Sequence, residues 1–470
     1  MEVAAASAAV LQNLCVNAEV KEKAVDSGIL PPLSSMVTMQ WEKDEGGEKK
    51  GGEGDTRVLI EIASGLLRNI SIAEGNKAKI VSAGIIPGVV RLLITLRGDE
   101  EEATKQSATV EHCAVLLRNL STNEDNRRVI AGAGGVAPLV GVLKLFSTTA
   151  LSAAHAGTIV EQACGALQNL SVREEIKSKI VGSGGVGVVN GILRSSDSFP
   201  LRALEEALGT LRNLTAAREG LGQEAESALQ EAIQPLVELM VPSGGGHGGS
   251  GGLSTRLFQS GRAAEHALVA LRNLTLVESN AKVGLDAGLL PPVVHLLRTN
   301  CSPLASAGGS SGGGGGGSSL ALRAVEHTVV IMRNLTASKA CLSAVVRTSD
   351  AIDSLLPLLQ SPLEAVQEAT SSCLCNIAAT ANTSIAAGLD PAQLMLAGGV
   401  IPQSLLLIRS PNGSVRTQAS ALLRNLSSAP STVRHIVGEG GLGGFAALLR
   451  NPIGSEQEKT QCQMNSVIVL

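Results

Sequence analysis

Aromatic residues are almost missing from this chain. Phenylalanine, tryptophan and tyrosine make up 1% of its 470 residues, and tyrosine does not occur at all. Hydrophobic residues still reach 44%, so there is ample material for a core. That core must be built from leucine, valine, isoleucine and alanine, which are side chains that suit closely packed helices.

Signals for nucleic acids and membranes are also missing. The net charge is only −4, and no basic tract of the kind that holds phosphate backbones occurs, so nucleic-acid binding is not expected. The chain does not open with a basic segment followed by an apolar one, and no apolar run approaches the roughly 18 residues of a membrane span. We therefore expect a cytoplasmic protein, with the nucleus as a second location, and no membrane insertion.

Cysteine pairs with zinc-ligand spacing do not occur among the eight cysteines. Cys113, Cys164 and Cys373 lie inside apolar phrases, which favours buried, reduced thiols over metal ligands. The seven histidines are scattered and form no catalytic arrangement. We predict no enzyme, no catalytic residue, no metal site and no cofactor.

The chain does contain one short phrase, written AVLLRNLS at residues 114–121, that recurs at nine places. Every copy has an asparagine at the same position. These are Asn13, Asn69, Asn119, Asn169, Asn213, Asn273, Asn334, Asn376 and Asn425. The steps between them are 56, 50, 50, 44, 60, 61, 42 and 49 residues. A recurrence of this length predicts a solenoid of stacked repeats.

Each repeat reads as three helical segments. The first is polar and ends in glycine, as at 74–84, 123–134 and 173–184, where glycine supplies a left-handed C-terminal residue. The second is short and apolar with an early proline, as at 136–146. The third carries the phrase, as at 108–121. In this third segment, the residue two positions before the asparagine is apolar and the residue six positions before it is small. This spacing indicates a stripe that packs on neighbouring repeats.

The predicted organisation is a single solenoid over 1–470, with about eight full three-helix repeats and a partial repeat at each end. The repeats are 1–16 (partial), 17–72, 73–122, 123–172, 173–216, 217–276, 277–337, 338–379, 380–427 and 428–470 (partial). The last of these lacks the phrase but has a segment, 455–470, in the place of a third helix. Flexible insertions are predicted at 40–56, 97–107, 147–157, 242–252 and 302–319.

A three-helix unit of this length, with an A-L-R-N-L third helix, resembles the armadillo repeat. The resemblance covers the chain outside the insertions and implies an all-α, right-handed superhelical solenoid. It also implies that the third helices line a groove, where the nine asparagines form a ladder that binds the extended backbone of a partner protein. A side-chain amide suits this role because it offers both a donor and an acceptor. The alternative is that each asparagine only caps its helix.

One departure from the family separates its branches. Importin-α-type members have a tryptophan four residues before the asparagine, which holds lysines of a nuclear import signal. Here glycine, alanine, valine or serine stands at all nine places, with Gly65 and Gly165 among them. The only tryptophan, Trp41, lies in a charged insertion. The groove is therefore expected to resemble that of β-catenin rather than that of importin-α.

Arginine precedes the asparagine in six copies. These are Arg68, Arg118, Arg212, Arg272, Arg333 and Arg424. A row of guanidinium groups beside an amide ladder suits an acidic partner segment. The alternative is that each arginine is a solvated cation favoured by the negative end of its helix dipole. The sequence leaves both interpretations open.

The resulting prediction is a non-catalytic scaffold that binds extended, acidic segments of other proteins. Two alternatives remain. The chain is the substrate-binding portion of a larger ubiquitin-ligase-type protein, or it is a nuclear import adaptor, which the missing tryptophans disfavour.

Overall fold

The computed structural model describes residues 2–39, 53–97, 100–148, 153–216, 222–241, 257, 260–306, 315–380, 390–450 and 454–469. Every regular element in these ranges is a helix and none is a strand, which confirms the predicted all-α class. The chain divides into two compact units, Met1–Pro235 and Leu236–Leu470. That they form a single solenoid stays a prediction.

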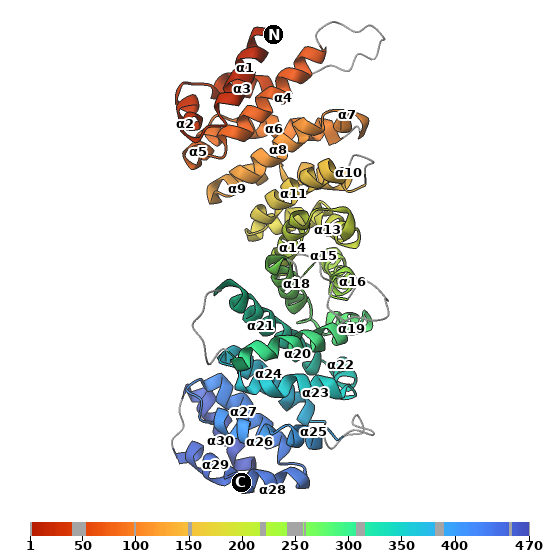
Figure 1. Ribbon diagram of the computed structural model, residues 1–470, viewed down its shortest axis with the longest axis vertical. Coiled ribbons are helices and arrows are strands. Elements are labelled where there is room, and N and C mark those ends of the chain that lie inside the picture. Colours follow the sequence, from red (N-terminus) through yellow and green to blue (C-terminus); the bar gives the residue numbers. More distant parts are fainter. Residues whose placement is uncertain are drawn as a thin grey trace. The chain divides into compact units, whose positions relative to one another are not determined.

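The first unit contains helices in the order that the repeat predicts (Figure 1). It begins with α1 (Glu2–Leu14). The first helices of its repeats are α2 (Ala18–Asp26), α5 (Glu74–Ser82), α9 (Glu124–Gly132) and α12 (Glu174–Gly182). The second helices are α3 (Leu30–Val37), α6 (Ile85–Arg97), α10 (Val136–Phe146) and α13 (Gly185–Arg194), which η1 (Ser196–Ser198) follows. The third helices are α4 (Glu53–Ile70), α8 (Ser107–Leu120), α11 (Ala153–Leu170) and α14 (Leu201–Thr215). The unit ends with α15 (Gln223–Gln230) and the start of α16 (Ile233–Glu238).

The second unit repeats the same order. Its first helices are α19 (Glu278–Asp286), α22 (Lys339–Val346), α25 (Pro391–Ala397) and α28 (Pro430–Gly438). Its second helices are α20 (Leu290–Ser306), α23 (Ser349–Leu355) with η2 (Leu356–Gln360), α26 (Val400–Leu407) and α29 (Gly441–Arg450). Its third helices are α18 (Gly261–Leu274), α21 (Gly315–Ala337), α24 (Glu364–Ala378), α27 (Gly413–Leu426) and α30 (Glu456–Val469). Helix α30 packs on α27 as α27 packs on α24, so it occupies the place of a third helix although it lacks the phrase.

Within each unit, helices of one kind stack on helices of the same kind. In the first unit α1, α4, α8, α11 and α14 pack on one another in turn, and α3, α6, α10 and α13 form a second layer. Leu117 and Leu167, two residues before their asparagines, are fully buried between the layers. The small residues Cys113 and Ala163 are also fully buried, where they let successive third helices approach closely. This confirms the packing stripe that was inferred from the spacing.

Glycine ends the first helix of most repeats, as predicted, although none follows α22. Gly84, Gly134 and Gly184 have φ angles of 72°, 80° and 77°. Side chains with a Cβ are strained in this left-handed region, so glycine permits the sharp turn into the second helix. At the other end of α9, the Asn123 side chain accepts hydrogen bonds from the backbone N–H groups of Asp125 and Asn126.

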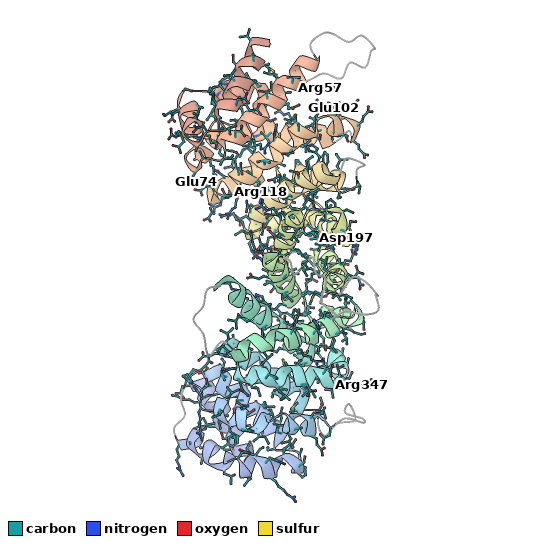
Figure 2. All side chains as sticks on the ribbon, viewed as in Figure 1. Arg57, Glu74, Glu102, Arg118, Asp197 and Arg347 are labelled. Atoms are coloured by element: carbon teal, nitrogen blue, oxygen red, sulfur yellow. The ribbon has the colours of Figure 1, made fainter. Side chains whose placement is uncertain are left out.

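The predicted flexible insertions differ in what the structure describes. The insertion at 97–107 is in part a helix, α7 (Glu100–Lys105), and the prediction of a flexible linker there is wrong. Ala103 of this helix is fully buried, and Glu102 forms an ion pair of 3.1 Å with Arg57 (Figure 2). Helices also cover the described parts of the predicted insertions 40–56 and 302–319 and part of 147–157. The insertion 242–252 lies outside the described residues.

Cys113, Cys164 and Cys373 are free thiols buried in the core, as predicted. Burial disfavours the charged thiolate, and it raises the pKa of Cys113 and of Cys373 to about 12. The pKa of Cys164 is raised for the same reason. These thiols therefore remain protonated at neutral pH and act as small apolar side chains.

Helix length and composition also bear on membrane crossing. Among the described residues, no single helix is both long and apolar enough to span a bilayer. Three pairs of consecutive helices reach that length and composition only when taken together, and each pair bends by 80° or more at its break.

Candidate functional site

The ladder asparagines lie near the C-terminal ends of the third helices, and seven of the nine amides, all but those of Asn13 and Asn273, are seen to reach back to the preceding repeat. Asn169 Nδ2 donates a hydrogen bond to the Arg118 carbonyl oxygen at 3.3 Å, and Asn213 Nδ2 donates to that of Gln168 at 3.2 Å. In the second unit, Asn334 Nδ2 donates to the Arg272 carbonyl oxygen at 3.1 Å. The ladder therefore joins consecutive repeats, whatever else it binds.

A hydroxyl group of the preceding repeat completes this contact. Asn169 Nδ2 lies 3.0 Å from Ser121 Oγ, and Asn213 Nδ2 lies 3.0 Å from Ser171 Oγ. The same contact joins Asn119 to Ser71, Asn334 to Thr275 and Asn376 to Thr336. Each hydroxyl stands two residues after its own repeat's asparagine, as the last letter of the phrase. Sequence reasoning missed this role, although the recurring serine or threonine was the signal for it.

These contacts settle which way the amides face. A backbone carbonyl can only accept, so the Asn169 amide must turn its NH₂ group toward the neighbouring repeat. The expectation that both halves of the amide are available to a partner is therefore corrected. The NH₂ group already holds the repeats together, and no hydrogen bond to the Asn169 oxygen is found among the described residues. Asn169 is partly exposed, as contact with a partner requires.

A second polar residue, seven positions after the ladder asparagine, binds the same helix end. Asn126 Nδ2 donates to the Leu120 carbonyl oxygen at 3.2 Å. Asn76 Nδ2 donates to the carbonyl oxygens of Ile70 and Lys21, both at 3.0 Å. These buried amides satisfy carbonyls that the end of a helix leaves without partners. They position the ladder and were not predicted from the sequence.

Two arginines of the phrase in the first unit, Arg68 and Arg118, bind carboxylates of the repeats that follow. The Arg118 guanidinium on α8 lies 3.4 Å from Glu161 Oε1 on α11 and 2.5 Å from Glu206 Oε1 on α14 (Figure 2). It also donates to Gln162 Oε1 at 2.8 Å. Arg68 forms a similar pair with Glu111 at 3.7 Å. Arg118 thus bridges three successive third helices instead of pointing away as a solvated cation.

The Arg118 side chain crosses the place where import adaptors carry tryptophan. A Cβ added to Gly165 would lie 2.6 Å from Arg118 Nε and 3.0 Å from Arg118 Cζ. The guanidinium of the preceding repeat lies directly over Gly165, so a larger side chain at this position would have to displace the Arg118 side chain.

Two other arginines of the phrase bind amide oxygens. Arg212 donates to Asn213 Oδ1 at 3.2 and 3.0 Å. Arg424 donates to Asn425 Oδ1 at 3.2 and 3.1 Å, and to Asn465 Oδ1 at 2.8 Å. In both repeats the arginine occupies the oxygen of its own ladder amide, so a partner would have to displace it there.

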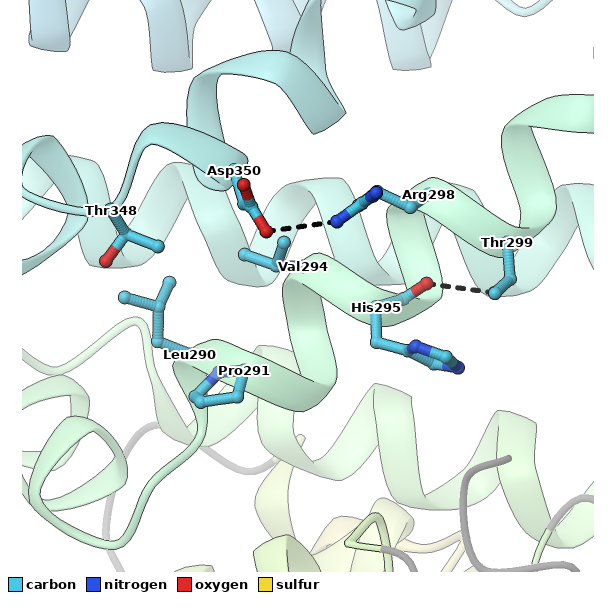
Figure 3. Close-up of a pocket in the computed structure, with 8 residues that line it drawn as sticks. All are labelled: Leu290, Pro291, Val294, His295, Arg298, Thr299, Thr348 and Asp350. Carbon is cyan, nitrogen blue, oxygen red and sulfur yellow. Dashed lines mark hydrogen bonds and ion pairs between the residues drawn. The ribbon is translucent and has the colours of Figure 1, made fainter. Parts of the chain in front are cut away.

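A separate hollow of about 820 Å³ lies on the second-helix side of the second unit (Figure 3). Leu290, Pro291 and Val294 of α20 form its apolar wall. Across it, Arg298 on α20 forms an ion pair of 3.0 Å with Asp350 at the start of α23. Both charged side chains are mostly exposed. None of the asparagines and arginines predicted as partner contacts lines this hollow.

Comparison with known proteins adds evidence on the fold. No protein-family model and no curated protein matches the sequence. An engineered protein with a known crystal structure aligns over 99% of this chain and 94% of its own, with a TM-score of 0.67 and 22% identity. A designed armadillo repeat protein aligns over 60% of this chain and 100% of its own, with a TM-score of 0.44 and 18% identity. The first likeness shows a shared fold and nothing about function.

We expect the ladder to contribute to stability. Asn169→Ala removes the contacts to Arg118 and Ser121, and it should lower the free energy of unfolding by about 1 to 2 kcal/mol. Asn13→Ala is the control, because Asn13 lies exposed on α1, and its effect should stay within about 0.5 kcal/mol. Urea unfolding followed by circular dichroism measures both. Equal unfolding midpoints for the two variants would contradict a stabilising role of the ladder.

Proposed function

We propose that this chain is a non-catalytic, armadillo-type scaffold that binds an extended segment of another protein along its third helices. The observation that supports this most is the fixed direction of the ladder amides. Because the NH₂ group of Asn169 is anchored to the preceding repeat, its oxygen is held in place before a partner arrives. An acceptor that is already oriented loses little entropy on binding a partner N–H group.

Several such acceptors are needed for useful affinity, because one hydrogen bond adds only about 1 kcal/mol net. Stacked repeats supply them in a row, at Asn69, Asn119 and Asn169 in the first unit. For these three oxygens no hydrogen bond is found among the described residues. An extended backbone presents N–H groups at regular intervals, which suits a row of acceptors better than a compact ligand would.

Nuclear import remains a weaker proposal, because the tryptophans that hold an import signal are missing from all nine copies of the phrase. The acidic character of the partner is part of the main proposal, and the arginines of the phrase are the groups that would recognise it.

The test compares three full-length baits. One is the natural chain, one carries Asn119→Ala, Asn169→Ala and Asn213→Ala, and one carries Ser71→Ala, Ser121→Ala and Ser171→Ala. The serine variant loses the hydroxyl partners of the same three amides but keeps the asparagines. We expect captured proteins, identified by mass spectrometry, to be lost from the asparagine variant and kept by the serine variant.

Two results would refute the proposal. If both variants recover the same proteins as the natural chain, the ladder does not bind the partner. If both lose them equally, the loss comes from weakened contacts between repeats and not from the asparagine oxygens.

A further inference from the structure

The arginines of the phrase differ in what surrounds them, and Arg212 of the first unit, which donates to the Asn213 amide oxygen, resembles Arg424 of the second unit. In the first unit Arg68 and Arg118 lie against the carboxylates Glu111, Glu161 and Glu206. The side chains of these three glutamates are only 12% to 15% exposed, so they lie within the face rather than out in solvent. Water screens such partly buried pairs less than surface pairs, and the positive charge of both arginines is compensated inside the protein.

Among the described residues of the second unit, the arginines of the phrase form no such ion pair with a carboxylate. Arg272 contacts the His327 ring nitrogen Nδ1 at 3.2 Å, and Arg424 contacts amide oxygens. Arg333 forms no ion pair among the described residues. The glutamates at the corresponding places, Glu326 and Glu368, likewise form no ion pair with these arginines in the described part of the chain.

The histidine beside Arg272 does not add a charge of its own. Burial lowers the pKa of His327, and the nearby Arg272 guanidinium lowers it further. The ring is therefore neutral near pH 7, and its Nδ1 accepts the hydrogen bond from Arg272. Arg272, Arg333 and Arg424 thus present guanidinium groups whose charge is not neutralised by a paired carboxylate.

We infer that Arg272, Arg333 and Arg424 form a docking surface for a carboxylate-rich segment of a partner protein, and that Glu161 and Glu206 exclude such a segment from Arg118. This assignment rests on the proposed scaffold function and says where on the scaffold an acidic segment binds. On this assignment Asn69, Asn119 and Asn169 contact a partner through amide oxygens, whereas Arg272, Arg333 and Arg424 also select for charge.

The energetic reason is an exchange of partners. A carboxylate that binds Arg118 must displace Glu161 or Glu206, so one ion pair replaces another with little net gain. A carboxylate that binds Arg333 displaces no carboxylate of the described residues, and the charge-assisted hydrogen bonds that form are a net gain. Nucleic acid is a poorer match for this surface, because the chain offers almost no aromatic side chains on which bases could stack.

The test measures the binding of fluorescein-labelled deca-glutamate to the full chain by fluorescence anisotropy at low salt. Arg333→Gln is expected to weaken binding roughly fivefold or more, and Arg118→Gln to change it by less than about twofold. These two variants are matched, because each removes one guanidinium at the same position of the repeat. Thermal unfolding of each variant confirms that it is folded at the assay temperature.

A gain-of-binding variant tests the second half of the inference. Glu206→Gln, combined with Glu161→Gln, releases Arg118 and is expected to tighten deca-glutamate binding about twofold or more. Unchanged or weaker binding in this double variant would overturn the claim that the two glutamates exclude an acidic segment.

Three further results would overturn the surface itself. They are no binding of deca-glutamate to the natural chain, equal losses in Arg118→Gln and Arg333→Gln, and equally tight binding of labelled oligothymidylate, which would indicate a preference for phosphate. Failure here is distinguishable from failure of the scaffold. If the asparagine variant alone loses its captured proteins while Arg333→Gln changes nothing, the scaffold stands and the acidic surface does not.

Discussion

Replacing Arg416 with alanine is expected to lower the free energy of unfolding by about 3 kcal/mol. Arg416 lies on α27 and is only 1% exposed, which is unusual for arginine. Its NH1 group donates to the carbonyl oxygens of Ser410 at 2.6 Å and Pro411 at 2.8 Å. Alanine would leave both carbonyls without this donor and would open a cavity beneath the turn that precedes α27.

Two further variants separate these causes. Arg416→Met keeps most of the side-chain volume and loses the hydrogen bonds, so it should destabilise less than alanine does. Arg409→Ala is the control, because Arg409 is exposed nearby, and its effect should stay within about 0.5 kcal/mol. Urea unfolding provides the measurement. If Arg416→Ala behaves like Arg409→Ala, the buried guanidinium contributes little to stability.

The features that the sequence predicted well are those that depend on spacing along one helix. Leu117 and Leu167 are buried because they recur at one position of the third helix, and periodicity alone reveals that. Gly134 and Gly184 adopt positive φ because a helix that must turn sharply needs a residue without a Cβ. Both depend on local geometry, which most repeats reproduce.

The features that the sequence did not reveal depend on contacts between side chains of different repeats. Arg118 and Arg333 stand at the same position of the phrase, yet Arg118 bridges three helices and Arg333 forms no ion pair among the described residues. Gln162 and Glu206, which bind Arg118, lie outside the phrase, and the phrase does not show that Arg118 reaches over Gly165 of the next repeat. The direction of the Asn169 amide was hidden in the same way, because it is set by a carbonyl one repeat away.

Some contacts between repeats did leave a signal in the sequence. The serine or threonine that ends the phrase recurs because it accepts a hydrogen bond from the next repeat's asparagine, as Ser121 does from Asn169. Asn76 and Asn126 recur seven residues after the ladder asparagine for a related reason. A polar residue that returns in register inside an apolar repeat therefore indicates a buried hydrogen bond as readily as a binding site.

Two glycines of α13, only two residues apart, should respond to alanine in opposite directions. A Cβ on Gly185 would lie 2.8 Å from the Ile180 carbonyl oxygen and 2.6 Å from Ile180 Cγ2. A Cβ on Gly187 would meet nothing within 4 Å. Gly185→Ala is expected to lower the free energy of unfolding by about 2 kcal/mol, because backbone atoms must move apart. Gly187→Ala is expected to raise it by up to about 1 kcal/mol, because alanine favours the helix.

The clash at Gly185 cannot be relieved by a change of rotamer, because the nearest backbone atom belongs to the last turns of α12. The same close approach recurs in other repeats, where a Cβ on Gly135 would lie 3.0 Å from the Ile130 carbonyl oxygen and one on Gly441 would lie 2.6 Å from that of Ile436. Glycine at this place therefore sets how tightly the first and second helices of a repeat meet. Urea unfolding of the two single variants tests this directly, and a stabilising effect of Gly185→Ala would show that the two helices can separate without cost.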